Sequence, residues 1–367
     1  MRIAVNAGSL KINHFETFIK LARLHSQHTF YFFFDTETNC RDLPQNIIPV
    51  VITPAATTPL KWRIWYNLKL PSALQKNTAN IFISEKFISL KTKLPQILMQ
   101  PDLTFIHQPS LIDKKQILFY KKNTLKFLET ATAIIVNSLF LKKEIIAHFK
   151  ISQTKIHVIF PSIKNLTPAT NEEKQLIKDK YAEENEYFIY KGVVSMEKNL
   201  VNLLKAFSFF KKRQRSKMQL LITGPRGEKH EEFVRSLQSY KFKNDVKVLP
   251  HLAAKESEKI LACAYAMVYV PFYESEGIEV IEAMKCEVPL IISDTEFLKE
   301  YCADAALYVK PDNINDIAEK MMLFFKDEQK RKQFIEKERL QIKVFENTNP
   351  NAALFKIIKE TEEWSSL

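Results

Sequence analysis

Glycine is scarce in this chain of 367 residues. There are five glycines, Gly8, Gly192, Gly224, Gly227 and Gly277, where an average composition would supply about 7%. We expect these few to occupy positions where a side chain does not fit. Long apolar runs are lacking as well, so no membrane-spanning helix is expected. The start, MRIAVNAGSL, enters a strand at once and has no signal-peptide pattern.

Paired cysteines and acidic metal motifs are also missing. The four cysteines, Cys40, Cys263, Cys286 and Cys302, are scattered and form no C-x-x-C pair. This pattern indicates neither a disulfide framework nor a cysteine metal site, and it favours a reducing cytoplasm. No Asp-x-Asp pair follows a predicted strand, so we expect no metal and no other cofactor.

The chain carries a formal net charge of +12, which favours an anionic partner such as a nucleotide-sugar, a lipid phosphate or a membrane surface. An AT-rich genome would give the same lysine-rich bias, and both explanations stay open. Leu60–Leu70 (LKWRIWYNLKL) and Lys211–Lys217 (KKRQRSK) suit an anionic membrane. Core packing with a basic outer face and a solvated helix end are the simpler interpretations. No nucleic-acid module is evident.

Short apolar runs alternate with helical segments along the whole chain. Strands are expected at Arg2–Val5, Thr29–Phe34, Ile47–Ile52, Ile81–Ser84, Thr104–His107, Ala133–Asn137 and Lys155–Phe160, and then at Tyr187–Tyr190, Met218–Thr223, Val246–Leu249, Ala266–Val270, Leu290–Ser293 and Ala306–Val309. This rhythm predicts an α/β fold with two doubly wound, Rossmann-like domains facing across a cleft. A polar break at Pro161–Thr170 places the two domains at residues 1–165 and 166–345. We expect a helix at about 346–367 to pack back on the first domain.

The segment PFYESEGIEVIEAMKCEVPLIISD, residues 271–294, is the most informative. Glu274 and Glu282 lie eight positions apart, on either side of Gly277, and the flanking apolar runs predict a strand, a loop, a helix and a strand. The free N–H groups at a helix N-terminus suit a phosphate, and carboxylates suit sugar hydroxyls. A surface helix start with acidic residues near the positive end of the dipole is the simpler alternative.

This segment resembles the E-x7-E signature of family-four glycosyltransferases, which are retaining enzymes with the GT-B fold. The matching positions are Glu274, Gly277, Ile278, Ile281, Glu282, Ala283 and Met284. Ser275, Glu276 and Glu279 depart from the family pattern. The resemblance implies that Glu274 contacts the donor sugar and that Glu282 holds the nucleotide ribose. The amides of Gly277 and Ile278 would then bind the diphosphate.

A second segment, YFIYKGVVSMEKNL at Tyr187–Leu200, is similar to the family's strand, G-R-x-x-x-x-K-N and helix arrangement. Gly192 and Lys198 match, and the resemblance implies that Lys198 contacts the donor diphosphate. Val193 stands where the family has an arginine, so half of the phosphate clamp is missing. A solvated lysine beside an asparagine N-cap is the alternative.

Two further residues follow predicted strands of the first domain. His107, in FIHQ, matches the histidine of the family's His-Asp pair, whereas Gln108 departs from it. The resemblance implies that His107 lies in the reaction cleft, but a lone histidine after a strand is more often structural than catalytic. Ser138, in AIIVNSL, resembles a cleft-facing serine of relatives. The glycine-rich loop that follows the first strand in many relatives is reduced in this chain to Gly8.

These observations predict a retaining glycosyltransferase that moves a sugar from a nucleotide-sugar to an acceptor hydroxyl, in surface polysaccharide or glycolipid assembly. The expected partners are the donor, a glycan or lipid-linked acceptor and an anionic membrane at the inner cytoplasmic face, but no nucleic acid. Three departures from the family pattern fall on the phosphate side, namely the missing arginine at position 193, the reduced glycine loop, and the like charges on Glu276 and Glu279. They predict weak donor binding or a different handling of the phosphate. A catalytically degenerate, glycosyltransferase-like binding protein is the alternative.

Overall fold

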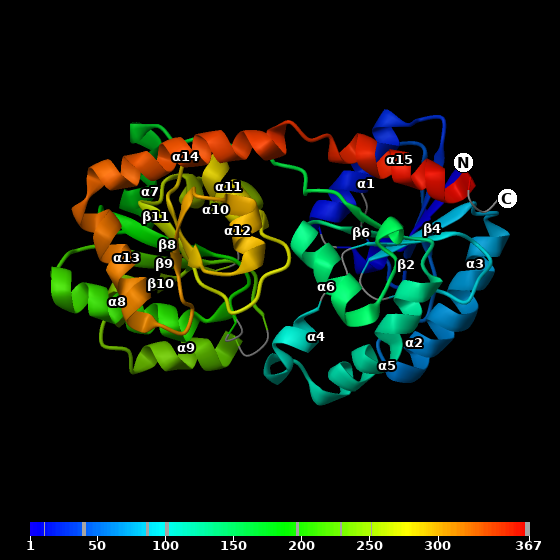
Figure 1. Cartoon of the computed structure of the whole chain (residues 1–367), viewed down its shortest axis with the longest axis horizontal. Helices are drawn as coiled ribbons and strands as arrows, with labels where there is room; N and C mark the ends of the chain where they lie inside the picture. Colours follow the sequence, from blue (N-terminus) through cyan, green and yellow to red (C-terminus); the bar gives the residue numbers. More distant parts are fainter. Residues whose placement is uncertain are drawn as a thin grey trace. The chain divides into compact units, whose positions relative to one another are not determined.

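The computed structural model describes residues 1–10, 12–38, 42–85, 88–99, 103–195, 198–227, 230–250 and 252–363. Cys40 lies outside the described residues. The chain divides into two compact units (Figure 1). Unit 1 comprises Met1–Ser162 and Asn349–Leu367, and unit 2 comprises Ile163–Thr348.

Unit 1 is built on a seven-stranded parallel sheet with the order β3-β2-β1-β4-β5-β6-β7. Its strands are β1 (Arg2–Val5), β2 (Thr29–Phe34), β3 (Ile47–Val51), β4 (Ile81–Glu85), β5 (Gln96–Met99), β6 (Ala133–Val136) and β7 (Ile156–Val158). Its helices are α1 (Ile12–Leu24), α2 (Pro59–Ile64), the π-helix η2 (Trp65–Lys69), α3 (Leu70–Lys76), α4 (Thr104–His107), α5 (Lys114–Thr130), α6 (Leu139–Phe149) and α15 (Pro350–Glu363), with the short 3₁₀ turn η1 (Ala7–Ser9) after β1.

Helices cover both faces of this sheet, which explains why its strands are apolar throughout rather than alternating. Ile3 and Val5 of β1 share one core with α1 and α15, and these two helices lie side by side (Figure 1). Ala4 points to the opposite face, where Trp65 and Tyr66 are buried. The core interpretation of Leu60–Leu70 is therefore confirmed.

Unit 2 is built on a six-stranded parallel sheet with the order β10-β9-β8-β11-β12-β13. Its strands are β8 (Tyr187–Lys191), β9 (Gln219–Thr223), β10 (Val246–Val248), β11 (Ala266–Tyr269), β12 (Leu290–Ser293) and β13 (Ala306–Val309). Its helices are α7 (Asn171–Tyr181), α8 (Leu200–Gln214), α9 (His230–Gln238), α10 (Ala254–Ala262), α11 (Ile278–Lys285), α12 (Glu296–Cys302), α13 (Ile314–Lys326) and α14 (Glu328–Glu346).

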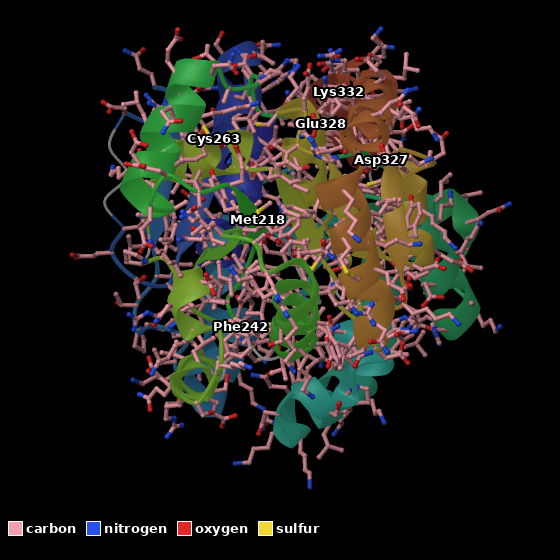
Figure 2. The ribbon with its side chains drawn as sticks, turned by 90° about the vertical axis from the view of Figure 1, so that its left-hand side faces the viewer. Met218, Phe242, Cys263, Asp327, Glu328 and Lys332 are labelled. Carbon is pink, nitrogen blue, oxygen red and sulfur yellow. The ribbon has the colours of Figure 1, made fainter. Side chains whose placement is uncertain are left out.

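Side-chain caps fix several of the helix starts in unit 2. Thr170 and Glu173 form a reciprocal capping box at α7, and Asp327 caps α14 next to Glu328 (Figure 2).

Lys211, at the end of α8, is buried and donates to the carboxylate of Asp245, so it is not the exposed cation that its basic run predicted. Cys263 (Figure 2), Cys286 and Cys302 are buried free thiols. Among the described residues, no helix is both long and apolar enough to span a membrane.

One predicted strand is wrong. Thr104–His107 forms the short helix α4, in which the Gln108 N–H donates to the Thr104 carbonyl, while the neighbouring strand of the sheet is β5, Gln96–Met99. Both segments are short apolar runs, and periodicity does not separate strand from helix at that length. His107 therefore does not follow directly on a strand.

Both sheets reverse their strand order between their first and fourth strands. The reversal lies between β1 and β4 in unit 1 and between β8 and β11 in unit 2. Open parallel sheets of this kind bind ligands beyond the carboxyl ends of the two strands that flank the reversal. The residues that follow β8 and β11 are therefore the first place to look for a site in unit 2.

Candidate functional site

The loops that follow β8 and β11 carry most of the residues singled out in the sequence. Lys191 ends β8 and Gly192 follows it, and the segment from Val270 to Gly277 connects β11 to α11. Gly277 has a left-handed backbone and occupies the N-cap position of α11, as the sequence predicts. The structure thus brings the glutamate segment and the lysine segment to one edge of the sheet in unit 2.

Glu274 is buried, with an exposed fraction of 5%, and its carboxylate is saturated with hydrogen bonds. Oε1 accepts from the backbone N–H groups of Ser275 and Glu276 at 2.9 and 2.8 Å. Oε2 accepts from Lys198 Nζ at 3.1 Å and from the Tyr269 hydroxyl. Burial alone would raise the pKa of Glu274, but Lys198 and these hydrogen bonds outweigh it and hold the pKa below its usual value.

Glu282 lies further along the chain, within α11, and is also buried. Its two oxygens pair with different lysines, Oε1 with Lys164 at 3.0 Å and Oε2 with Lys191. Lys164 also pairs with Glu258. Burial would raise the pKa of Glu282, but Lys191 and then Lys164 lower it below the usual value. Both glutamates of the motif are therefore ionised and neutralised inside the unit.

Glu279 behaves differently from these two carboxylates. Loss of hydration and the neighbouring charge of Glu274 raise its pKa, whereas the charges of Lys191 and Lys198 oppose this rise. Burial and the charge of Glu274 also raise the pKa of Tyr269 well above its usual value. Tyr269 therefore stays a hydrogen-bond donor to Glu274 across the physiological range.

Glycine is required where the loops after β8 and β9 meet. A Cβ on Gly224 would lie 1.8 Å from the carbonyl oxygen of Gly192, and one on Gly227 would lie 2.5 Å from Val193. At Gly277 a Cβ would approach the rings of Phe297 and Tyr301 at 2.8 and 2.9 Å. These positions confirm that glycine remains where a side chain does not fit. Gly8 is the exception, because its nearest neighbour would lie at 3.4 Å.

Lys198 is not the solvated lysine of the simpler interpretation, because it pairs with buried Glu274 and is 24% exposed. The next residue, Asn199, occupies the N-cap position of α8 without a side-chain capping bond. Its amide instead donates to the carbonyls of Val270 and Pro311, at 2.8 and 2.7 Å. Asn199 thereby fixes the start of α8 against the end of β11.

The two remaining predicted residues belong to unit 1. Ser138 is fully buried and caps α6, accepting from the Leu141 N–H at 3.1 Å. His107 ends α4, and its Nε2 contacts Glu144 Oε2. Contact of either residue with a donor sugar stays a prediction.

Lys191 and Lys164 were missed in the sequence. Lys191 is the last residue of β8, two positions before Val193, where the expected arginine is absent. Lys164 lies in the polar break between the predicted domains. Lysines are frequent in this chain, and spacing alone does not distinguish one that pairs with a buried carboxylate from one in solvent. The surroundings of Glu282 therefore hold more positive charge than the sequence suggested.

Comparisons with known proteins show which family and which fold this chain resembles. The family model described as "Glycosyl transferases group 1" matches residues 171–341. O-antigen chain mannosyltransferase B of Escherichia coli is 24% identical over 229 residues, which cover 62% of this chain and 60% of that protein. O-antigen chain mannosyltransferase RfbU of Salmonella typhimurium is 26% identical over 209 residues, 57% of this chain and 54% of that protein. The chain therefore matches little more than half the length of these relatives.

Solved structures show the same fold over nearly the whole chain. The Anabaena protein HepE, solved in complex with UDP and glucose, superposes with a TM-score of 0.75 at 13% identity, covering 98% of this chain and all of that one. The two doubly wound α/β units expected from the sequence are thus confirmed as a GT-B fold. Residues 171–341, which lie in unit 2, thus match the glycosyl transferases of group 1, and the whole chain shares the fold of HepE.

Proposed function

We propose that this protein is a retaining glycosyltransferase that moves a sugar from a nucleotide-sugar to an acceptor hydroxyl in the assembly of a surface polysaccharide or glycolipid. The observation that carries the proposal is the pair of buried, lysine-neutralised carboxylates, Glu274 and Glu282, at the strand reversal of unit 2. The match of residues 171–341 to the glycosyl transferases of group 1 and the similarity to two O-antigen mannosyltransferases support it.

In this proposal the donor lies at the amino end of α11. The amides of Gly277 and Ile278 and the ammonium group of Lys198 bind the diphosphate, Glu282 holds the ribose, and Glu274 orients the sugar. Lys198 already bonds Glu274, so donor binding exchanges one anionic partner of Lys198 for another. Such an exchange neutralises the incoming phosphate without leaving Lys198 unpaired.

Catalysis in this proposal consists of positioning and charge stabilisation. The donor phosphate takes up negative charge as the glycosidic bond breaks, and cations fixed beside it lower the energy of that state. Lys191 and Lys198 are fixed by buried carboxylates at this edge. Arg226, which is 73% exposed, comes from the loop paired with Val194. We propose that these three cations replace the absent arginine and that the transfer requires no divalent metal.

A basic face of α5 in unit 1 suits an anionic membrane that presents a lipid-linked acceptor. This face carries exposed lysines together with two exposed leucines, namely Lys114, Lys115, Lys121, Lys122, Lys126, Leu118 and Leu125. Exposed lysines flanking apolar side chains are typical of helices that lie on anionic bilayers. We propose that the enzyme works in the cytoplasm and contacts the inner face of the membrane through α5.

A thermal-shift screen of the full-length chain against nucleotide-sugars, followed by transfer assays, tests the donor proposal. Ligand at 100 times its dissociation constant stabilises a protein by roughly 2.7 kcal/mol. Glu282→Gln and Lys198→Met should lose most of that stabilisation. Lys337→Met, which removes an exposed pair with Asp304 in the same unit, should keep it. Full donor stabilisation in the first two variants would refute the assigned site.

Transfer assays separate the enzyme from the degenerate alternative, which the valine at position 193 and the single glycine after β1 favour. Donor binding without transfer or donor hydrolysis would support that alternative. Transfer that is lost in Glu274→Gln and survives a chelator would support the metal-free enzyme. Co-sedimentation with phosphatidylglycerol vesicles, weakened in a Lys121→Glu/Lys122→Glu variant but not in Lys337→Glu, would support the membrane face.

A further inference from the structure

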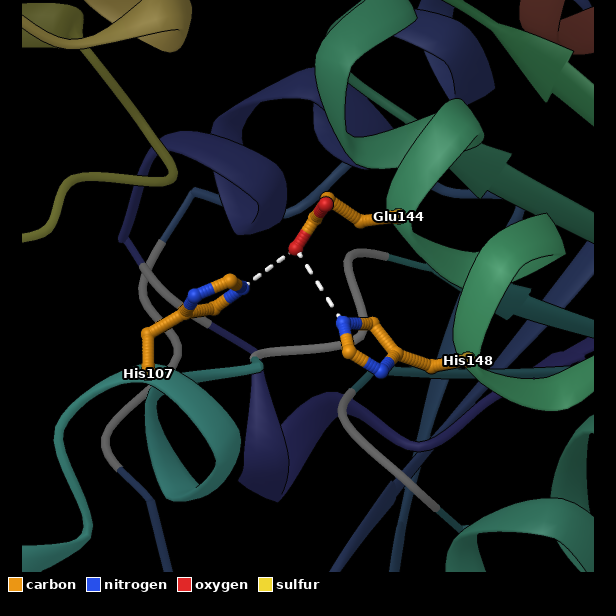
Figure 3. A group of neighbouring side chains, drawn as sticks. All are labelled: His107, Glu144 and His148. Atoms are coloured by element: carbon orange, nitrogen blue, oxygen red, sulfur yellow. Dashed lines mark ion pairs between the residues drawn. The ribbon is translucent and has the colours of Figure 1, made fainter.

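A cluster of metal-binding side chains lies on unit 1, away from the lysine–glutamate pairs described above. Glu144 and His148 are one turn apart on α6 and lie on the same face of that helix. His107, the last residue of α4, reaches the same spot. Figure 3 shows both histidine rings turned toward the Glu144 carboxylate.

From this cluster we infer that His107, Glu144 and His148 form a binding site for a divalent transition-metal ion such as Zn²⁺. Two imidazole nitrogens and one carboxylate oxygen are a ligand set that zinc accepts, with a fourth position left for water. Among the described parts of the chain, no other group of three such ligand atoms lies close enough to hold one ion. The inference does not depend on the proposed transferase activity, and it gives His107 a role other than contact with a sugar.

The distances suit one ion. Zinc binds such nitrogens and oxygens at about 2.0–2.1 Å, so two ligand atoms around a tetrahedral ion lie roughly 3.3 Å apart. His148 Nε2 and Glu144 Oε2 are 3.5 Å apart, and all three ligand atoms lie within 4.8 Å of one another. His107 contacts Glu144 directly, so the ion would enter by replacing this contact.

Burial and rigidity also favour binding. His107 Nε2 and Glu144 Oε2 are shielded from solvent, whereas the His148 side chain is 39% exposed and leaves a path for an ion. Two of the three ligands stand on one helix whose start is capped by Ser138 and whose end is set by Lys150 in a left-handed conformation. Binding would therefore require rearrangement mainly of His107 and would tie α4 to α6.

The competing explanation is an ion pair in which a protonated histidine shares its proton with Glu144. The two explanations differ in their response to metal, because zinc requires neutral imidazoles and releases any bound protons. His14 offers a control: its Nδ1 lies 3.3 Å from Glu85 Oε1, but this pair belongs to no group of three ligands among the described residues.

Calorimetric titration of the chelator-stripped, full-length protein with ZnCl₂ tests the inference, with Co²⁺ absorption reporting the coordination geometry. We expect one Zn²⁺ per chain. His148→Ala and Glu144→Gln should weaken binding by more than the roughly 10–100-fold that loss of an outer-shell partner costs. His14→Ala should leave it unchanged.

Two outcomes would overturn the inference. One is the absence of stoichiometric Zn²⁺ uptake by the wild-type chain, and the other is equal affinity in the wild type and in His148→Ala. Because His148 is partly exposed, its replacement should not unfold the protein. Tryptophan fluorescence confirms folding independently, since Trp62 and Trp65 both lie in unit 1.

Discussion

The two sheets reverse their strand order in the same way, but the polar groups at the two reversals differ. In unit 2, buried Glu274 and Glu282 are neutralised by lysines. In unit 1, Glu85 at the end of β4 is fully buried and pairs with His14, while Asn6 after β1 donates to the Tyr66 hydroxyl. The same topology thus carries lysine–carboxylate pairs at the reversal in unit 2 and a histidine–carboxylate pair at the reversal in unit 1.

Backbone packing differs between the two units as well. Unit 2 holds four of the five glycines, and its loops after β8 and β9 touch backbone to backbone. Gly8, after β1 in unit 1, has room for a methyl group. Close loop packing brings unit 2's own amides and lysines together, which is what a site for a diphosphate needs.

Gly224→Ala should give the largest effect. Its Cβ would overlap the Gly192 carbonyl, and its φ of +145° is rarely adopted by other residues. We expect a loss of at least about 3 kcal/mol in the free energy of unfolding, measured by urea denaturation. Gly8→Ala should stay within about 1 kcal/mol of the wild type. Equal losses in the two variants would remove the contrast between the units.

Lys198→Met should have the next largest effect. Removing one partner of a buried ion pair costs about 3–5 kcal/mol, and partial exposure of Lys198 reduces this to roughly 1–3 kcal/mol. Urea denaturation at two ionic strengths measures it. If the double variant Glu274→Gln/Lys198→Met proves as unstable as Lys198→Met alone, the unpaired Glu274 carboxylate is not the cause of the stability loss.

A fall in pH should weaken unit 1 before unit 2. Burial is the main cause that lowers the pKa values of His25, His28 and His157, all in unit 1. As pH falls, the unfolded chain therefore takes up protons before the folded chain does. The stability that these histidines contribute is lost as pH falls below about 6.5. Glu274 and Glu282 also have lowered pKa values, so their contribution is lost only as pH falls below about 4.5.

Tryptophan fluorescence and hydrogen exchange measure the two units separately. Residues 163–348 contain no tryptophan, so fluorescence reports on unit 1, while exchange in β8 and α11 reports on unit 2. His25→Gln should reduce the acid sensitivity of the fluorescence signal. Loss of protection in β8 at pH values where unit 1 is still intact would contradict the expected order of unfolding.

The smallest effect belongs to exposed pairs. Lys337→Met removes a contact with Asp304 in which both side chains are at least 42% exposed. We expect a change of at most about 1 kcal/mol, reduced further by salt. A larger cost would mean that burial does not explain why the lysines paired with Glu274 and Glu282 contribute more to stability than the surface lysines do.

Much of the fold could be predicted from the sequence, because strands buried on both faces are apolar throughout. β12 and β13 have the predicted bounds, and Gly277 starts α11 as expected. The sequence failed at β5 and α4, where two four-residue apolar runs compete for one place in the sheet. Lys164 and Lys191 could not be found because their role depends on Glu282, which is about 90 residues or more away in sequence. Long-range pairing of charges leaves no local pattern.

The core of unit 1 is closed by residues from the far end of the polypeptide. Leu354, Phe355 and Ile358 of α15 share one core with β1, whereas unit 2 is a single continuous stretch. Domains tend to fold as they leave the ribosome, so unit 2 can be complete while the sheet made first still lacks its last helix. The half of the molecule that is synthesised first is therefore finished last, and until α15 docks its apolar surface stays exposed.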